Sequence, residues 1–156
     1  MDTKKQSSSQ PQKLKIEIDS TLSSTVMAAM AVRGICEWAH VALDTVNRIE
    51  LCLVEVLNNA VEHAYSNEPG STIEIIVKKS RSVISLTVSD WGLIMPDDTL
   101  SAPLAGAIAT GGSDSAPDLK ASGRGLFIVR SLMGNIQYYS KNGKNSFFME
   151  MTISES

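Results

Sequence analysis

One helical segment constrains this chain more than any other feature, because it places polar groups beside an apolar stripe. Apolar residues recur through it at the spacing of one helix face, namely Ile49, Leu53, Leu57, Ala60 and Ala64. Glu55 and Asn59 are one turn apart on this helix, so their side chains point to the same side of it. A carboxylate that can accept a proton then stands beside an amide oxygen that can bind a hard cation, which suits phosphate chemistry better than packing. The plainer interpretation is that both residues are solvated on an exposed face.

Length and composition exclude several classes of protein. The 156 residues suit one domain with a core of its own, and 43% apolar residues with a net charge of −3 describe an ordinary globular protein. Acidic and basic residues are mixed along the chain, so direct nucleic-acid binding is not expected. No apolar stretch is long enough to span a bilayer, and the start of the chain lacks the apolar part of a signal peptide. We therefore expect a cytoplasmic protein with no membrane contact.

The polar start and the two cysteines fit this expectation. Residues 1–12 are rich in Ser and Gln, and we expect them to form a disordered tail. Cys36 and Cys52 both fall in helical patterns and are expected to be reduced thiols. Two Cys and two His, scattered as they are, do not predict a zinc site.

Apolar periodicity and turn signals predict the order strand, helix, helix, strand, strand, long loop, helix, strand, strand. The expected strands are residues 13–19, 72–79, 83–90, 135–141 and 146–153. The expected helices are residues 22–39, 44–65 and 125–133. Ser20 and Asp44 are the expected N-caps, and Gly134 is the expected glycine after the last helix. Strands in adjacent pairs with helices between them indicate an α+β sandwich, with a mixed, mostly antiparallel sheet and helices on one face.

The segment 92–122 differs from the rest of the chain. It is dense in Ser, Thr, Asp, Pro, Gly and Ala and has little periodicity, although a short helix near 103–109 is compatible with it. A long irregular loop inside a compact domain is uncommon and is usually functional or mobile.

Two further signals flank this loop. Asp90 closes a strand and Gly92 follows it, so an acid that can accept a hydrogen bond from an exocyclic amine stands where the backbone can approach a flat ring. Gly123 and Gly125 lead into an apolar helix, whose free N–H groups and dipole form an anion site. Each signal alone has a plain alternative, an ordinary turn after a strand and a flexible loop-to-helix junction.

Taken together and in this order, the segments resemble the GHKL ATP-binding domain of gyrase, histidine kinases and MutL. More closely, the chain resembles the anti-sigma-factor serine/threonine kinases of bacterial partner-switching systems, over residues 13–153. The run from Glu55 to Tyr65 is similar to the family's N box, the run from Asp90 to Gly92 to its first glycine box, and the run from Gly123 to Met133 to its second. One departure is that Leu93 and Ile94 follow Gly92, where the first box often has a second glycine.

The resemblance implies a two-layer sandwich of the Bergerat (GHKL) type and a nucleotide site that uses ATP and Mg²⁺. In such a site Asn59 coordinates the Mg²⁺ that bridges the phosphates, Glu55 is the general base, and Asp90 holds the adenine amino group. The three glycines that shape the nucleotide pocket are Gly92, Gly123 and Gly125. Residues 93–122 form the ATP lid, and Arg124 at its edge reaches a phosphate or remains solvated.

The resemblance also implies a function and its partners. The implied protein is an ATP-dependent serine/threonine kinase that phosphorylates a STAS-domain anti-anti-sigma protein and sequesters a sigma factor or another client. A homodimer is expected. The alternative is a nucleotide-binding or partner-binding module that regulates by sequestration without phosphoryl transfer. An ATPase clamp of the gyrase or MutL type fits less well, because those proteins carry a transducer domain.

Several other residues have a structural and a functional interpretation, and the structural one is favoured for each. His63 is expected to hydrogen-bond locally on its helix. Ser146 could reach adenine through a water molecule, but a plain strand serine is expected. Trp38 and Phe127 are expected to fill the core. Met27, Met30 and Met133 are expected to be helix residues in the core or at an interface.

Overall fold

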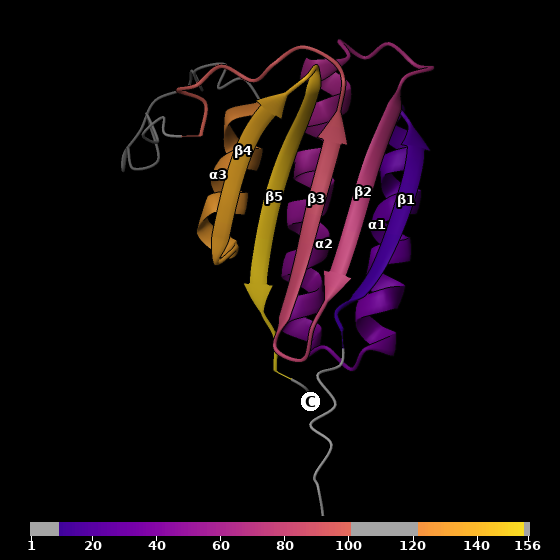
Figure 1. Ribbon diagram of the computed structural model, residues 1–156, viewed down its shortest axis with the longest axis vertical. Coiled ribbons are helices and arrows are strands. Elements are labelled where there is room, and N and C mark those ends of the chain that lie inside the picture. Colours follow the sequence, from indigo (N-terminus) through magenta and orange to yellow (C-terminus); the bar gives the residue numbers. More distant parts are fainter. Residues whose placement is uncertain (1–9, 101–121, 155–156) are drawn as a thin grey trace, which may run out of the picture.

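The computed structural model describes residues 10–100 and 122–154. The strands are β1 (Gln12–Asp19), β2 (Thr72–Lys79), β3 (Val83–Asp90), β4 (Asn135–Lys141) and β5 (Lys144–Thr152). The helices are α1 (Leu22–Trp38), α2 (Leu43–Asn59), its π-helical continuation η1 (Ala60–Ala64) and α3 (Ser122–Leu132). All helices cover one face of a single sheet, so the predicted two-layer α+β sandwich and its element order are confirmed (Figure 1).

Neighbouring strands are antiparallel throughout the sheet, whose order is β1-β2-β3-β5-β4. The expected mixed sheet is therefore corrected to an antiparallel one, and the connections explain why. Two helices between β1 and β2 return the chain so that these strands run in opposite directions. One helix between β3 and β4 makes those two strands parallel, but β5 lies between them and is antiparallel to both.

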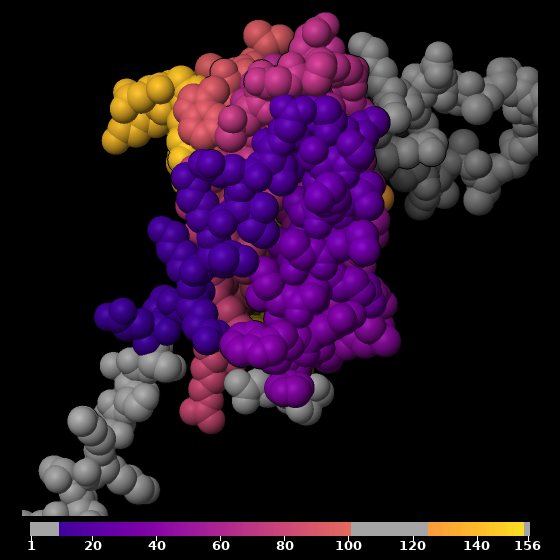
Figure 2. Space-filling view, turned by 90° about the vertical axis from the view of Figure 1, so that its right-hand side faces the viewer, coloured from indigo at the N-terminus to yellow at the C-terminus, as the bar shows by residue number. Residues whose placement is uncertain are grey.

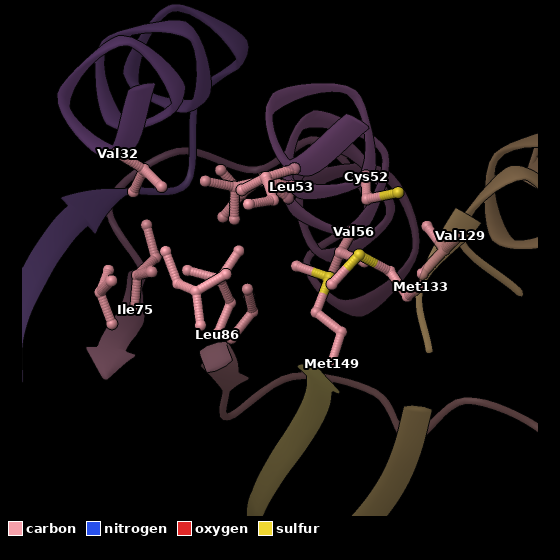
Figure 3. Packing of buried hydrophobic residues seen from close by; sticks show 14 of the residues in the cluster. Val32, Cys52, Leu53, Val56, Ile75, Leu86, Val129, Met133 and Met149 are labelled. Carbon is pink, nitrogen blue, oxygen red and sulfur yellow. The ribbon is translucent and has the colours of Figure 1, made fainter. Parts of the chain in front are cut away.

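The core lies between the helices and the inner face of the sheet. Ile75 of β2, Leu86 of β3 and Met149 of β5 are fully buried and point toward Leu53 of α2 (Figure 3). The apolar stripe predicted for this helix is buried along its length, so α2 is the central helix of its layer. This packing fixes the rotation of α2 and thereby the direction in which its polar residues point.

The N-cap expected for the first helix is wrong. The Thr21 side chain caps α1 by accepting a hydrogen bond from the Ser24 N–H at 3.3 Å. Ser20 is buried instead, where its hydroxyl donates to the Glu68 carbonyl at 2.7 Å and accepts from the Ser71 N–H at 3.1 Å. Ser20 therefore joins the start of α1 to the turn before β2.

The second helix begins and ends differently from the prediction. Ala42 is its N-cap residue, so Asp44 lies in the first turn, where its charge faces the positive end of the helix dipole. The α-helix ends at Asn59, and the chain continues as a π-helical turn to Ala64. A π turn inserts one residue into the helical ladder and is frequent at functional sites.

The glycine-rich segment before the last helix is part of that helix. α3 begins at Ser122, three residues before the predicted start, so Gly123 and Gly125 both lie in its first turn. Gly134 does not end the helix in a left-handed conformation. Its N–H donates to the Glu150 carbonyl at 3.0 Å, so it leads into the pairing of β4 with β5.

The last hairpin turns through two residues, where a turn over 142–145 was expected. Asn142 and Gly143 both have positive φ, 53° and 77°, as a type I′ turn requires. β5 therefore begins at Lys144, and Asn145 lies in the strand directly opposite Asp90 of β3.

Several side chains expected in the core are on the surface. Trp38 is 67% exposed and Phe127 is 38% exposed, so neither fills the core. Met27 and Met30 are also exposed on α1, whereas Met133 is buried against α2 and the sheet.

Both cysteines are free and buried. Burial raises the pKa of the Cys36 and Cys52 thiols to about 11, so both are protonated and unreactive near neutral pH. The short helix expected near 103–109 and most of the expected lid lie outside the described residues. In the described part of the chain, no helix combines the length and the apolar character that crossing a membrane requires.

Candidate functional site

A cavity of about 510 Å³ opens at the end of α2. It lies between η1, the end of β3, the segment 93–99 and the inner faces of β4 and β5. Its walls are mostly apolar, and its polar lining residues are Asn59, His63, Asp90, Thr99 and Tyr138. A mostly apolar cavity with a few convergent polar groups, in the range of roughly 300–1,000 Å³, is the usual form of a small-molecule site.

Asp90 is the acidic residue in the lining of this cavity. It is 9% exposed, and its Oδ1 accepts hydrogen bonds from the Asn145 amide at 2.8 Å and from the Gly92 N–H at 3.0 Å. Burial raises the pKa of the Asp90 carboxyl above its ordinary value, and these two hydrogen bonds offset part of the rise. Asp90 is thus a fixed acceptor in a mostly apolar pocket.

Gly92 lies where only glycine fits. A Cβ at this position would collide with the Ala64 carbonyl oxygen, at the end of η1. The next residue, Leu93, donates its N–H to the same carbonyl at 2.9 Å. The turn after β3 therefore rests directly on the end of η1, without the second glycine that the first box often has.

The π turn sets which residues of this helix line the cavity. Asn59 and Ala60 line it from one turn, and His63 and Ala64 line it from the next turn. The cavity therefore brings the Asn59 amide and the Asp90 carboxylate together from separate elements.

Glu55 is placed differently from Asn59. It is half-buried and is not among the residues that line the cavity. Its carboxylate lies instead against the backbone of Gly125 in the first turn of α3, where a Cβ on Gly125 would collide with it. Glycine at this position therefore makes room for the carboxylate at the N-terminus of α3.

Gly123 and Arg124 belong to the same first turn of α3. Its unbonded N–H groups and the helix dipole favour an anion at this end of α3. The Arg124 side chain lies outside what the structure describes, so its predicted contact with a phosphate stays a prediction.

Two residues that shape the cavity were not predicted from the sequence. Tyr138 lines it, and its hydroxyl accepts a hydrogen bond from the Met95 N–H at 2.9 Å, which fixes the segment after β3. Asn145 holds Asp90 from the neighbouring strand. The Asn-Gly pair at residues 142–143 was a partial signal, because a two-residue turn there places Asn145 in β5 opposite Ser140 of β4.

Ser146 points away from this site. It is buried on the opposite side of the sheet, where its hydroxyl shares a hydrogen bond with Ser89 at 2.9 Å. The expectation of a plain strand serine is therefore confirmed.

Comparison with known proteins agrees with this geometry. Residues 18–151 match the family model described as the histidine kinase-like ATPase domain. The serine/threonine-protein kinase BtrW of Bordetella bronchiseptica is 30% identical over 132 residues, which cover 80% of this chain and 87% of that protein. The anti-sigma F factor of Geobacillus kaustophilus is 29% identical, over 67% of this chain and 66% of that protein.

A solved structure shows the same fold. The RsbU and RsbW domains of a Mycobacterium tuberculosis protein superpose with a TM-score of 0.61 at 15% identity, covering 93% of this chain and 33% of that one. The family match spans the cavity, the π turn and the first turn of α3. The chain therefore belongs to the histidine kinase-like ATPase domain family, in the group of serine/threonine-protein kinases and anti-sigma factors.

Proposed function

We propose that this chain is an ATP- and Mg²⁺-dependent serine/threonine protein kinase of a partner-switching system. It phosphorylates a STAS-domain anti-anti-sigma protein and, when that protein does not compete, sequesters a sigma factor or another client. The observation that supports this most is the single cavity that joins Asn59 to Asp90, with the Glu55 carboxylate at the nearby N-terminus of α3.

The cavity fits the nucleoside of ATP. Val88, Ile94 and Phe147 give it apolar walls for a flat ring, and Asp90 offers an acceptor for an exocyclic amine. The first turn of α3, with Gly123 and Gly125, is suited to the phosphates, because unbonded N–H groups there complement negative charge.

Asn59 is the residue that would hold Mg²⁺. Asn59 lines the cavity together with Asp90, and its side-chain oxygen is a hard ligand. Mg²⁺ retains several waters and commonly takes phosphate oxygens as further ligands, so one amide oxygen from the protein suffices. When bound, the ion would neutralise charge on the transferred phosphoryl group.

Glu55 is the proposed general base. It would accept the proton of a substrate serine or threonine hydroxyl while the γ-phosphoryl group of ATP bonds to that oxygen and ADP leaves. Because the carboxylate lies against Gly125 in the first turn of α3, it is beside the proposed position of the phosphates and away from the proposed position of the adenine ring.

The partner contacts are assigned to surfaces outside the cavity. The face shown in Figure 2 is formed mostly by β1, α1 and α2, and the exposed apolar side chains on α1 are Leu22, Val26, Met27, Met30 and Trp38. Exposed apolar surface of this extent favours a protein contact, and we assign it to a homodimer or to the client. A cytoplasmic location is proposed because sigma factors act there.

Phosphoryl transfer from radiolabelled ATP to a cognate STAS-domain protein tests the proposal. We expect transfer by the wild type, a loss of at least about 100-fold in Glu55→Gln, because a positioned base contributes about that much, and loss of ATP binding in Asn59→Ala. Glu37→Gln, an exposed acid on α1, serves as the control for removing a carboxylate. Unchanged transfer in Glu55→Gln would refute its role as base.

One observation favours the sequestration-only alternative. Glu55 does not line the cavity and lies under Gly125, so the carboxylate must have access to the partner's hydroxyl for transfer to occur. Calorimetry separates the two functions. Tight Mg-ATP binding without phosphorylation of the STAS-domain protein would support sequestration alone.

A further inference from the structure

Asn145 makes an unusually complete set of contacts beside Asp90. It is 1% exposed, and its Nδ2 donates to Asp90 Oδ1 at 2.8 Å and to the Gly92 carbonyl at 3.1 Å. Its Oδ1 accepts from the Ser140 hydroxyl at 2.8 Å. The amide thus joins β4, β5 and the turn after β3.

These contacts allow only one orientation of the amide. Turning it over would place its oxygen against the Asp90 carboxylate and the Gly92 carbonyl, so three acceptors would face one another. The Ser140 hydroxyl would at the same time lose its acceptor. The direction of the two N–H donors is therefore fixed by the surrounding groups.

The two carboxylate oxygens of Asp90 therefore differ in the hydrogen bonds that they accept from the protein. Oδ1 receives two donors, from Asn145 and from the Gly92 N–H. A carboxylate oxygen has about two lone-pair positions, so these donors occupy it. Oδ2 is the oxygen that remains to accept a hydrogen bond from a ligand in the cavity that Asp90 lines.

We propose that Asn145 is a positioning residue that holds Asp90 as a fixed acceptor and thereby makes the site select adenine over guanine. This inference rests on the proposed function, because it requires a purine nucleotide in the cavity. Adenine presents an amino group at its six-position, and guanine presents a carbonyl oxygen there. A fixed acceptor binds the first and repels the second.

The charge state of Asp90 supports the same conclusion. Burial favours a protonated Asp90, which could rotate and donate a hydrogen bond to the guanine carbonyl. The N–H groups of Asn145 and Gly92 oppose this, since hydrogen bonds to a carboxylate favour its charged form. Removing the Asn145 amide therefore weakens the selection in two ways, by freeing the carboxyl group and by favouring its protonation.

Equilibrium binding of Mg-ATP and Mg-GTP to the purified chain tests this role. We expect the wild type to prefer ATP strongly and Asn145→Ala to lose about tenfold or more of this preference, which corresponds to one buried charge-assisted hydrogen bond. Ser140→Ala removes only the hydroxyl that fixes the amide, from an exposed position, and is expected to lose a smaller part of it. Ser140→Thr keeps the hydroxyl and should restore the wild-type preference.

Ser146→Ala is the matched control. Ser146 is the next residue of the same strand, is equally buried, and also bonds across to β3, but on the other face of the sheet. Its removal should lower stability without changing the ratio of ATP to GTP affinity.

The outcomes separate this inference from the proposed function. An ATP preference that survives in both Asn145→Ala and Ser140→Ala would overturn the role of Asn145 and leave the nucleotide site in place. Wild-type chain that binds neither nucleotide would overturn the proposed function and this inference with it. If Asn145→Ala does not fold, as circular dichroism would reveal, the comparison of Ser140→Ala with Ser140→Thr decides the question.

Discussion

Single residues in this protein gain their roles from the atoms they contact. Gly92 rests on the carbonyl of Ala64, and Gly125 rests on the carboxylate of Glu55. The first neighbour is main chain, which cannot move cheaply, and the second is the end of a flexible side chain. Two glycines that look alike in the sequence therefore have different consequences when replaced.

Replacing each glycine by alanine should separate stability from activity. We expect Gly92→Ala to destabilise the fold by about 1–3 kcal/mol, because backbone must shift to admit the methyl group. Gly125→Ala should displace the Glu55 carboxylate and thereby lower the rate of phosphoryl transfer. We expect its loss of stability to be smaller than that of Gly92→Ala. Denaturant unfolding and the transfer assay measure the two effects.

Gly34→Ala is the control for this comparison. Nothing lies within 4 Å of a Cβ at Gly34, which is inside α1, so alanine there should stabilise the fold by about 0.5–1 kcal/mol. A stability loss in Gly125→Ala as large as that in Gly92→Ala would contradict the distinction drawn between them.

At the scale of elements, the π turn after α2 organises the site. It ends the central helix so that Ala64 meets the turn after β3 and Tyr65 reaches two strands. The Tyr65 hydroxyl donates to the Thr72 carbonyl and accepts from the Trp91 N–H, at 2.7 Å and 2.8 Å. This one side chain thus holds the start of β2 and the exit of β3 together.

Tyr65→Phe should therefore weaken the fold at this point. We expect a loss of about 1–2 kcal/mol, since two hydrogen bonds disappear and the Trp91 N–H loses its partner. Tyr139→Phe, on the exposed side of β4, is the control and should change stability little. Equal unfolding midpoints for Tyr65→Phe and the wild type would show that these bonds contribute nothing.

The sequence predicts most of the helices and strands, but not the contacts that join them at the site. The strands 72–79 and 83–90 are correct to the residue, because alternation and β-branched residues define a half-buried strand and its ends. The π turn was missed because it shifts backbone hydrogen bonds without a side-chain signal. The start of α3 was missed because glycines favour a loop locally, and packing against α2 overrides that preference.

The candidate site, like the fold, was predicted only in part from the sequence. The sequence pairs Glu55 with Asn59 because they share a helix face, yet only Asn59 lines the cavity. Their separation depends on the docking of α3, whose residue Gly125 lies against the Glu55 carboxylate, and no local pattern encodes this contact. Asn145 was missed because its role depends on the register of β3 with β5, two strands that are far apart in the sequence.

At the scale of the whole molecule, an ion-pair cluster ties the outer face of the sheet together. Glu74 of β2 bonds Lys15 of β1 at 2.9 Å and Lys144 of β5 at 2.8 Å, and the Lys144 ammonium lies 5.3 Å from the centre of the Trp91 ring. Lys144 reaches over β3 to do so. These contacts connect three strands on the face opposite the helices of the described residues.

The stability contributed by Glu74 should depend on pH. The hydrogen bonds from Lys144 and Lys15 lower the pKa of the Glu74 carboxyl below its ordinary value of 4.5. Because the pKa is lower in the folded state, the contribution is present above pH 4.5 and is lost as the pH falls through the folded-state pKa.

Thermal unfolding of Glu74→Gln across pH checks this expectation. The variant should melt below the wild type at pH 7, and the difference should shrink below pH 4.5 as the wild-type carboxyl is protonated. Glu62→Gln, which removes a half-buried acid on η1, controls for the general effect of charge. A difference that does not change with pH would exclude the ion pairs as its source.

The central claim is that one nucleotide site joins the end of α2, the end of β3 and the start of α3. Amide chemical-shift mapping by two-dimensional NMR, during titration with Mg²⁺ and a non-hydrolysable ATP analogue, tests it most directly. We expect the largest shifts at Asn59, Asp90, Gly92 and Gly125, and we expect Asp90→Asn to abolish them. Shifts confined to other surfaces, such as the exposed face of α1, or no shifts at saturating nucleotide, would contradict it.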